Sequence, residues 1–320
     1  MKWTFELKAR IGLVFFGIFL ALVLLEIGLR IAGALFDLKY YKVQNNQARY
    51  RIFCLGESTT FGVGTQDPAQ ENYPHQLELL FKQQFPQTKT RVFFSQTIGI
   101  NTSTMLYNLP STLNKFKPDV VIMMVGLNNW WNLSNSNVLL FNKHERLQNL
   151  YFRTLGFFDG FRVFKLMKWI CYSTGLIQMD RRMVMDDVDV TDAGAVKKQG
   201  RQARRLAASL EAKGHMPVFF KVAEYDIRQM IRICRERKIK VVLCSYPGAT
   251  FGALKRVHER VAREEGLVFV DNGSYFDALP DKPSYFTADG IHPNAAGYKL
   301  MAAYIFNSMR HASVVPKEAN

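Results

Sequence analysis

Three short segments, far apart in the chain, carry the side-chain types that move acyl groups. The segments are Gly56-Glu57-Ser58, Gly126-Leu127-Asn128-Asn129 and Asp289-Gly290-Ile291-His292. A serine hydroxyl attacks a carbonyl carbon well only when a nearby imidazole accepts its proton, and a carboxylate then stabilises the imidazolium that forms. We therefore predict acyl-transfer chemistry with Ser58 as nucleophile, His292 as base and Asp289 as the carboxylate that orients the base.

The same chemistry needs hydrogen-bond donors for the negative charge that develops on the carbonyl oxygen. The backbone amides of Ser58 and Gly99 and the side-chain amide of Asn128 are donors of a suitable type. Losing one such donor typically costs about 3 kcal/mol of transition-state stabilisation. We predict that these three groups form an oxyanion hole.

Predicted strands and helices alternate along most of the chain and position these residues. Apolar runs indicate strands over residues 50–55, 91–95, 119–125, 239–245 and 267–270. Helical spacing of apolar residues indicates helices over residues 73–85, 102–116, 222–237, 251–265 and 294–309. The alternation predicts a three-layer α/β/α, flavodoxin-like sandwich with about five parallel strands. Ligands of such sheets bind beyond the carboxyl ends of the strands, where Ser58 and Asn128 are expected.

Residues 130–220 interrupt this alternation for far longer than a usual strand-to-helix connection. We interpret the segment as an insertion that forms a lid or a substrate wall, with Trp130 and Trp131 as wall candidates. The alternative is that its aromatic residues pack the core of a small helical subdomain.

The N-terminal region is apolar over residues 11–36, interrupted by Glu26 and Arg30 near its end. These two residues stand four apart and can pair on one helix face. The stretch predicts a membrane-spanning anchor with the N-terminus in the cytoplasm and the catalytic domain on the periplasmic or extracytoplasmic side. A cleaved signal peptide is the alternative, with Ala32-Gly33-Ala34 as a weak cleavage site.

The composition restricts the partners that we expect. The 320 residues include 42 Lys and Arg against 27 Asp and Glu, a formal charge of +15. This charge suits an anionic membrane surface, and we recognise no module for nucleic-acid binding. The four cysteines lack the spacing of a zinc site, so we expect neither a metal nor a cofactor.

With these motifs in order, the chain resembles the SGNH (GDSL-like) hydrolase superfamily, whose four sequence blocks supply Ser, Gly, Asn and His. The matching residues here are Ser58, Gly99, Asn128 and His292, with Asp289 three residues before the histidine. Two positions depart from the usual pattern. Glu57 stands where the family commonly has Asp, and Asn129 stands where Asp commonly follows the oxyanion Asn. We expect both to affect the support of the site rather than its chemistry.

The resemblance implies a serine esterase. Together with the predicted anchor and the basic charge, the family's range of carbohydrate and lipid esters predicts that it removes acetyl or short acyl groups from glycans or lipids of the cell envelope. The same residues would also serve an O-acyltransferase, and a non-catalytic glycan-binding scaffold of the same fold is a further alternative. The expected organisation comprises an anchor (1–37), a connector (38–49), a catalytic domain (50–129 and 221–312), the insertion (130–220) and a tail (313–320).

Overall fold

The computed structural model describes residues 5–45, 48–130, 136–137, 158, 161–173, 218–248 and 252–316. The chain divides into two compact units. One contains residues 1–46 and 145–179, and the other contains residues 47–144 and 180–320. Most of the predicted 130–220 insertion lies outside the described residues, so its role as a lid or wall stays a prediction.

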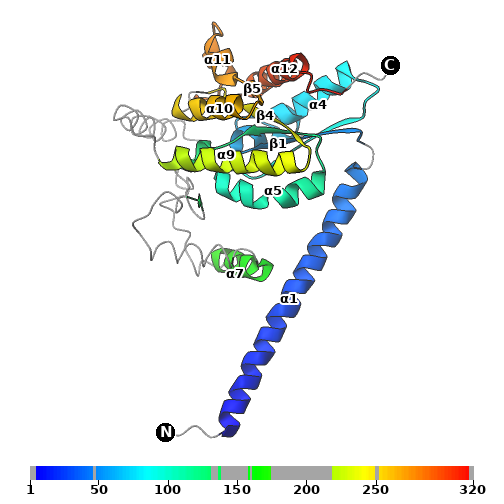
Figure 1. Ribbon diagram of the computed structural model, residues 1–320, viewed down its shortest axis with the longest axis vertical. Coiled ribbons are helices and arrows are strands. Elements are labelled where there is room, and N and C mark those ends of the chain that lie inside the picture. Colours follow the sequence, from blue (N-terminus) through cyan, green and yellow to red (C-terminus); the bar gives the residue numbers. More distant parts are fainter. Residues whose placement is uncertain are drawn as a thin grey trace. The chain divides into compact units, whose positions relative to one another are not determined.

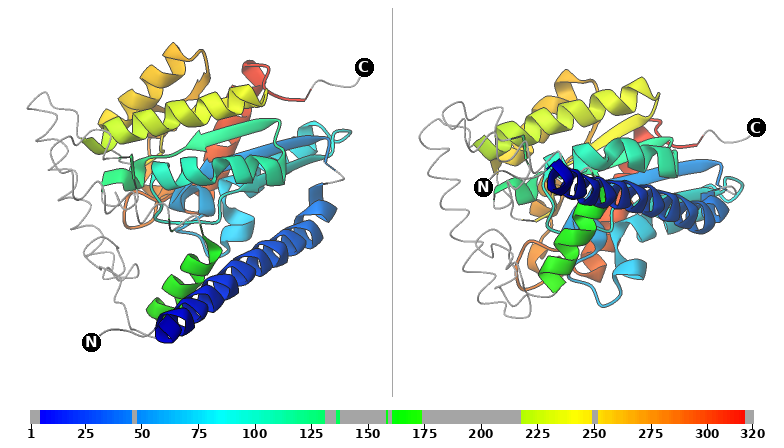
Figure 2. Two further views of the ribbon diagram at one scale, coloured as in Figure 1. Left: turned by 60° about the horizontal axis from the view of Figure 1, so that its bottom comes forward. Right: turned by 90° about the horizontal axis from the view of Figure 1, so that it is seen from below.

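A five-stranded parallel sheet forms the centre of the larger unit. Its strands are β1 (Tyr50–Gly56), β2 (Thr90–Phe94), β3 (Val120–Met124), β4 (Lys240–Cys244) and β5 (Val268–Val270), in the spatial order β2-β1-β3-β4-β5. All five residues of β3 are buried, as expected for a strand covered on both faces. Figure 2 shows the strands as one twisted layer between helices.

Helices cover both faces of this sheet (Figure 1). The long ones are α4 (Tyr73–Gln84), α5 (Thr102–Phe116), α9 (Val218–Glu236), α10 (Gly252–Glu264) and α12 (Ala295–His311). The Tyr50 ring contacts Phe81 of α4 with ring centroids 6.0 Å apart, whereas Phe53 contacts Phe116 of α5 at 5.1 Å. Positions 50 and 53 face opposite sides of β1 because side chains alternate along a strand. The predicted three-layer sandwich of parallel strands is confirmed.

Short helices lie in the connections: α2 (Ser58–Phe61), α3 (Pro68–Glu71), the 3₁₀ helix η1 (Leu127–Trp130), α11 (Asn272–Asp277) and the 3₁₀ helix η5 (Lys282–Tyr285). The predicted boundaries of the longer elements mostly agree with the structure to within two residues. Helix α9 is an exception, because it begins at Val218 rather than at 222. Phe220 in this extra turn is fully buried, so tertiary packing extends the helix beyond its amphipathic repeat.

The smaller unit contains the long helix α1 (Phe5–Asn45) and α7 (Arg162–Ser173). Residues Leu7–Gly33 of α1 are long and apolar enough to cross a membrane, as either a span or a signal sequence. The expected connector over residues 38–49 is helical as far as Asn45, because no Gly or Pro stands between residues 38 and 45 to end the helix. Arg30 and Glu26 form the predicted i, i+4 pair, with Arg30 Nε 2.6 Å from Glu26 Oε1.

Candidate active site

Ser58 lies at the carboxyl end of the sheet, at the first residue of α2 and two residues after the end of β1. Ser58 is partly buried, and its carbonyl accepts hydrogen bonds from the amides of Gly62 and Val63, both at 3.0 Å. The chain runs from β1 to its neighbour β2 and then crosses to β3 on the other side of β1, so the direction of strand addition reverses at β1. Such a switch point leaves a crevice beyond the strand ends, which is where sheets of this type bind ligands.

His292 and Asp289 reach Ser58 from the loop that precedes α12. The Nε2 atom of His292 lies 2.8 Å from Ser58 Oγ, and its Nδ1 atom lies 2.6 Å from Asp289 Oδ2. Ser58 and His292 are separated by 234 positions in the sequence. The fold therefore joins the three predicted residues in one continuous chain of hydrogen bonds from the hydroxyl to the carboxylate.

The other oxygen of Asp289 fixes the loop itself. Its Oδ1 atom accepts hydrogen bonds from Thr287 Oγ1 at 2.7 Å, from the Ile291 amide at 2.8 Å and from the His292 amide at 2.9 Å. Burial raises the pKa of Asp289, but the His292 side chain and these amides outweigh burial and hold the pKa well below its ordinary value. Asp289 therefore stays ionised beside the imidazole.

The predicted oxyanion donors lie at the same edge of the sheet. Asn128 belongs to η1, which follows β3, and its Nδ2 atom donates to the carbonyl of Ile100 at 3.3 Å. That carbonyl directly follows Gly99, which lies in the loop after β2 with a φ of 71°. A primary amide carries two N–H donors, and this contact uses one of them. This hydrogen bond holds the loop that carries Asn128 against the loop that carries Gly99.

Glu57 supports the loop that carries Asn128. The residue is 1% exposed. Its Oε1 atom accepts a hydrogen bond from the Gly126 amide at 3.0 Å, and Oε2 accepts one from the Tyr246 hydroxyl. Burial raises the pKa of Glu57 to about 7, against the lowering effect of these hydrogen bonds. Gly126 has a φ of 106°, a conformation that residues with a Cβ atom rarely adopt. The departure from the family pattern at Glu57 therefore falls on a supporting carboxylate, as expected.

Tyr246 is a site residue that the sequence reasoning missed. Its hydroxyl contacts Glu57, accepts from the Leu127 amide at 3.3 Å and lies 3.1 Å from the Met124 carbonyl. Its position just beyond the predicted strand 239–245 was a usable signal, because the carboxyl ends of all parallel strands meet at this edge.

Asn129 supports the same loop from the other side. Its Oδ1 atom accepts from the Thr102 amide at 2.9 Å, and its Nδ2 atom donates to Thr102 Oγ1 at 2.8 Å and to the Phe219 carbonyl at 3.4 Å. Thr102 Oγ1 in turn donates to the buried carboxylate of Asp226 at 2.6 Å. Asn129, the second position that departs from the family pattern, thus connects the end of β3 to the first turns of α5 and α9.

The remaining site predictions are tested only in part. Trp130 ends η1 and so directly follows the Asn128-Asn129 pair, while its side chain and the whole of Trp131 lie outside the described residues. Among the residues that the structure describes, no group of three His, Cys, Asp or Glu side chains is placed to hold a metal ion.

A parallel sheet with Ser, His and Asp side chains hydrogen-bonded at its carboxyl edge is the arrangement of a serine hydrolase. The model of the GDSL-like lipase/acylhydrolase family matches residues 54–300, and the chain belongs to this family. The protein is therefore a hydrolase that acts on esters.

Solved structures similar to the chain include lipases and an esterase. A GDSL-like lipase from Parabacteroides merdae is 14% identical, with 82% of this chain and 97% of that chain covered and a TM-score of 0.49. The lipase/acylhydrolase from Enterococcus faecalis is 14% identical, with 85% and 99% covered and a TM-score of 0.48. An acetylxylan esterase from Geobacillus stearothermophilus, crystallised as a catalytic mutant, is 14% identical, with 82% and 95% covered and a TM-score of 0.48. No curated protein sequence matches the chain.

Proposed function

We propose that the protein is a membrane-anchored serine esterase that uses Ser58, His292 and Asp289 as its catalytic triad. The observation that carries this proposal is the continuous hydrogen-bonded path from Ser58 Oγ through both nitrogens of His292 to Asp289 Oδ2. A serine that merely caps a helix needs no such partners. The short path is also the geometry that lets an imidazole accept the serine proton as the nucleophile attacks.

In this mechanism Ser58 Oγ attacks the ester carbonyl carbon while its proton passes to His292 Nε2. The negative charge on the carbonyl oxygen is stabilised by the amides of Ser58 and Gly99 and by the Asn128 side chain. The C–O bond then breaks, and the leaving alcohol takes the proton from His292. Water next attacks the acyl-serine with His292 as its base, so that the carboxylic acid is released and Ser58 is restored.

The substrates that we propose are acetyl or short acyl esters on glycans or lipids of the cell envelope. Three features support this class: the apolar helix over residues 11–36, the formal charge of +15 and the esterase family. We propose that the helix anchors the chain with its N-terminus in the cytoplasm and the site outside. Trp130 and Trp131 would form part of the wall for the alcohol portion of the ester.

Covalent labelling with a fluorophosphonate probe tests the proposed triad. We expect the detergent-solubilised protein to be labelled, and we expect labelling to be lost in Ser58→Ala and strongly reduced in His292→Ala. Ser308→Ala, which removes a hydroxyl from α12, is the matched control and should label like the wild type. Labelling that persists in Ser58→Ala would refute Ser58 as the nucleophile, provided that the variant keeps the wild-type melting temperature.

The substrate class needs a second measurement. We expect the wild type to release acetate or a short fatty acid from O-acylated envelope glycans or lipids, and Ser58→Ala to release none. Adding a sugar acceptor separates hydrolysis from acyl transfer, because transfer would yield an acylated sugar in place of the free acid. A labelled protein that releases no acid from any of these esters would refute the substrate proposal but leave the triad intact.

A further inference from the structure

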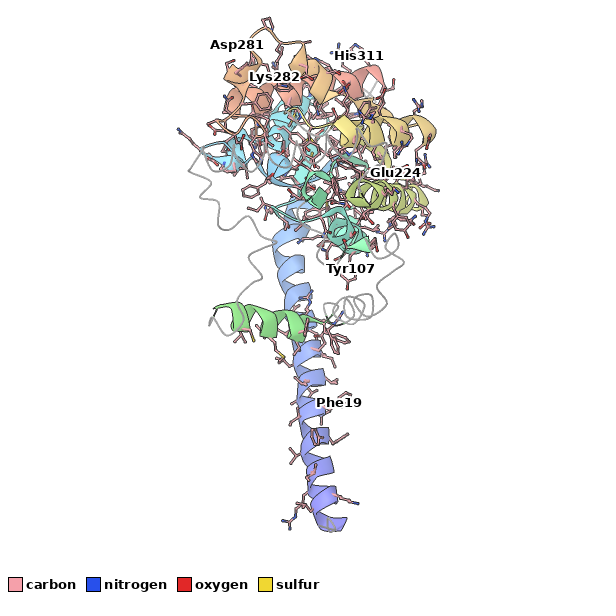
Figure 3. All side chains as sticks on the ribbon, turned by 90° about the vertical axis from the view of Figure 1, so that its left-hand side faces the viewer. Phe19, Tyr107, Glu224, Asp281, Lys282 and His311 are labelled. Atoms are coloured by element: carbon pink, nitrogen blue, oxygen red, sulfur yellow. The ribbon has the colours of Figure 1, made fainter. Side chains whose placement is uncertain are left out.

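Glu26 and Arg30 are charged residues inside the apolar part of α1. They pair with each other, and Glu26 also contacts a residue outside α1. A charge within a membrane-spanning helix is costly unless it is paired, and its partner usually indicates its role. The Glu26 side chain is only 14% exposed, whereas Phe19, one of its apolar neighbours along the helix, is 63% exposed and projects outward (Figure 3). A second element of the same unit therefore covers Glu26.

That element is the first turn of α7. Glu26 Oε2 accepts a hydrogen bond from the Val163 amide at 2.9 Å, and the Arg162 guanidinium donates to the Leu29 carbonyl at 3.0 Å. One turn further along α1, a Cβ atom at Gly33 would lie 1.8 Å from Arg162 Nη1, so the glycine leaves the space that the guanidinium occupies. One face of α1 is thus shaped to bind the start of α7.

This contact lies near the end of the apolar stretch. Counted from Ile11, Glu26 is 15 residues along the helix, or about 22 Å at the usual rise per residue. The hydrocarbon core of a bilayer is about 30 Å thick, which places Glu26 within about 8 Å of its far boundary. Helix α7 runs across α1 rather than along it (Figure 3), so a spanning α1 would bring α7 close to the plane of the membrane surface.

The sequence of α7 suits that surface. Val163, Leu166, Met167 and Ile170 follow the helical repeat and share one face, on which Met167 is 54% exposed and Ile170 is 43% exposed. The same repeat places positions Lys165 and Lys168 on the opposite side of the helix, and α7 contains no acidic residue. An amphipathic helix with basic residues on its polar side is typical of segments that lie in the lipid headgroup layer.

We propose that α7 is an interfacial helix that binds the surface of an anionic phospholipid bilayer at the outer end of α1, with its apolar face toward the acyl chains. The proposal rests on the membrane anchor proposed above, and α7 continues the surface that the anchor already presents to lipid. Glu26 receives a second partner from α7, the Val163 amide, in addition to Arg30 of its own helix. These two partners compensate the charge of a carboxylate within the span. Basic residues near the surface add attraction to anionic lipid.

Depth-dependent fluorescence quenching of the full chain in lipid vesicles tests this proposal. An environment-sensitive fluorophore is attached to a single cysteine in a Cys171→Ser background, since the other three cysteines are buried. The reporter position is Met167→Cys, and the matched control is Lys165→Cys on the opposite side of α7. Phe19→Cys reports insertion of α1. Vesicles of phosphatidylcholine, with or without phosphatidylglycerol, carry a spin label on the acyl chain near the headgroup.

We expect several-fold stronger quenching at Met167 than at Lys165, and stronger quenching at Met167 when phosphatidylglycerol is present. Equal quenching at the two positions, or quenching at Phe19 alone, would overturn the interfacial assignment. Quenching independent of phosphatidylglycerol would overturn the preference for anionic lipid. Turnover of a nitrophenyl ester by the same vesicles is measured separately, so a failure of the esterase proposal cannot be mistaken for a failure of this one.

Discussion

Asp289 has two oxygens with separate tasks, and this separation makes its role testable. Oδ2 contacts the His292 imidazole, whereas Oδ1 accepts three hydrogen bonds from its own loop. In Asp289→Asn the amide oxygen can replace Oδ1, so the loop keeps its conformation. The amide nitrogen then faces His292 Nδ1 as a donor and favours the wrong imidazole tautomer.

We therefore expect Asp289→Asn to lower kcat by about 10⁴-fold while the melting temperature changes little, as in other triads of this kind. Steady-state turnover of a nitrophenyl ester and a thermal unfolding curve provide the two measurements. Asp281→Asn, on an exposed residue of the preceding turn, is the control. Wild-type turnover in Asp289→Asn would remove Asp289 from the triad.

Glu57 provides a prediction about pH and stability. Because burial raises its pKa from 4.5 to about 7, the folded protein keeps a proton that the unfolded chain releases. The folded state therefore loses stability as pH rises between these two values. We expect the contribution of Glu57 to the free energy of unfolding to fall by about 2 kcal/mol between pH 5 and pH 7.

The measurement is denaturant unfolding of the wild type and of Glu57→Gln across this range. The glutamine variant cannot titrate and should lack this part of the pH dependence, whereas Glu236→Gln on an exposed side chain should retain it. Parallel pH profiles for the wild type and Glu57→Gln would show that Glu57 does not titrate there.

At the scale of elements, Asn129 joins three pieces of the larger unit that are distant in sequence. It lies beyond β3, bonds twice to Thr102 at the start of α5 and donates to the Phe219 carbonyl in α9. Aspartate, the residue that the family commonly has here, would place a charge against the Phe219 carbonyl and remove both N–H donors. The local partners of this chain thus favour asparagine.

We expect Asn129→Asp to lower the free energy of unfolding by about 1–3 kcal/mol, because it leaves buried acceptors without their donors. Activity should also fall, since Asn128 is the adjacent residue. Denaturant unfolding and kcat are the measurements. Asn108→Asp on the exposed side of α5 is the matched control. An Asn129→Asp variant as stable as the wild type would show that the hydrogen bonds donated by Asn129 do not stabilise the fold.

For the complete protein, whether α1 stays as an anchor or is cleaved as a signal peptide determines where the enzyme works. An anchor predicts a chain of the full 36.8 kDa that remains in the membrane fraction after alkaline carbonate extraction. Cleavage of a signal peptide after Ala34 would instead yield a shorter chain in the soluble fraction. Intact-mass measurement after expression separates these outcomes.

A double variant of α1 tests whether the apolar stretch holds the protein in the membrane. Replacing Leu20 and Leu24 by Asp places two carboxylates in the apolar stretch, each costing about 2.5–3.5 kcal/mol at the centre of a spanning helix. We expect this variant to be lost from the carbonate-washed membranes, whereas Leu20→Ala with Leu24→Ala should remain. Retention of the Asp variant would show that another part of the chain holds the protein on the membrane.

The parallel α/β/α fold could be predicted from the sequence, because strand and helix periods alternate clearly along the chain. The sequence also identified the family, because four short blocks occur in the required order around Ser58, Gly99, Asn128 and His292. Local periodicity and short motifs contain this information without reference to any distant contact.

Which side chains contact one another could not be predicted from the sequence, because it depends on the packing of distant elements. Tyr246 and Asp226 are single polar residues with no motif around them, and their contacts with Glu57 and Thr102 exist because separate elements converge at one edge of the sheet. The contact of Glu26 with the Val163 amide, 137 positions away, likewise depends on two helices of the smaller unit meeting, whereas its pair with Arg30 is local. Hydrogen-bond partners of buried polar groups depend on packing between distant segments, which no local sequence pattern records.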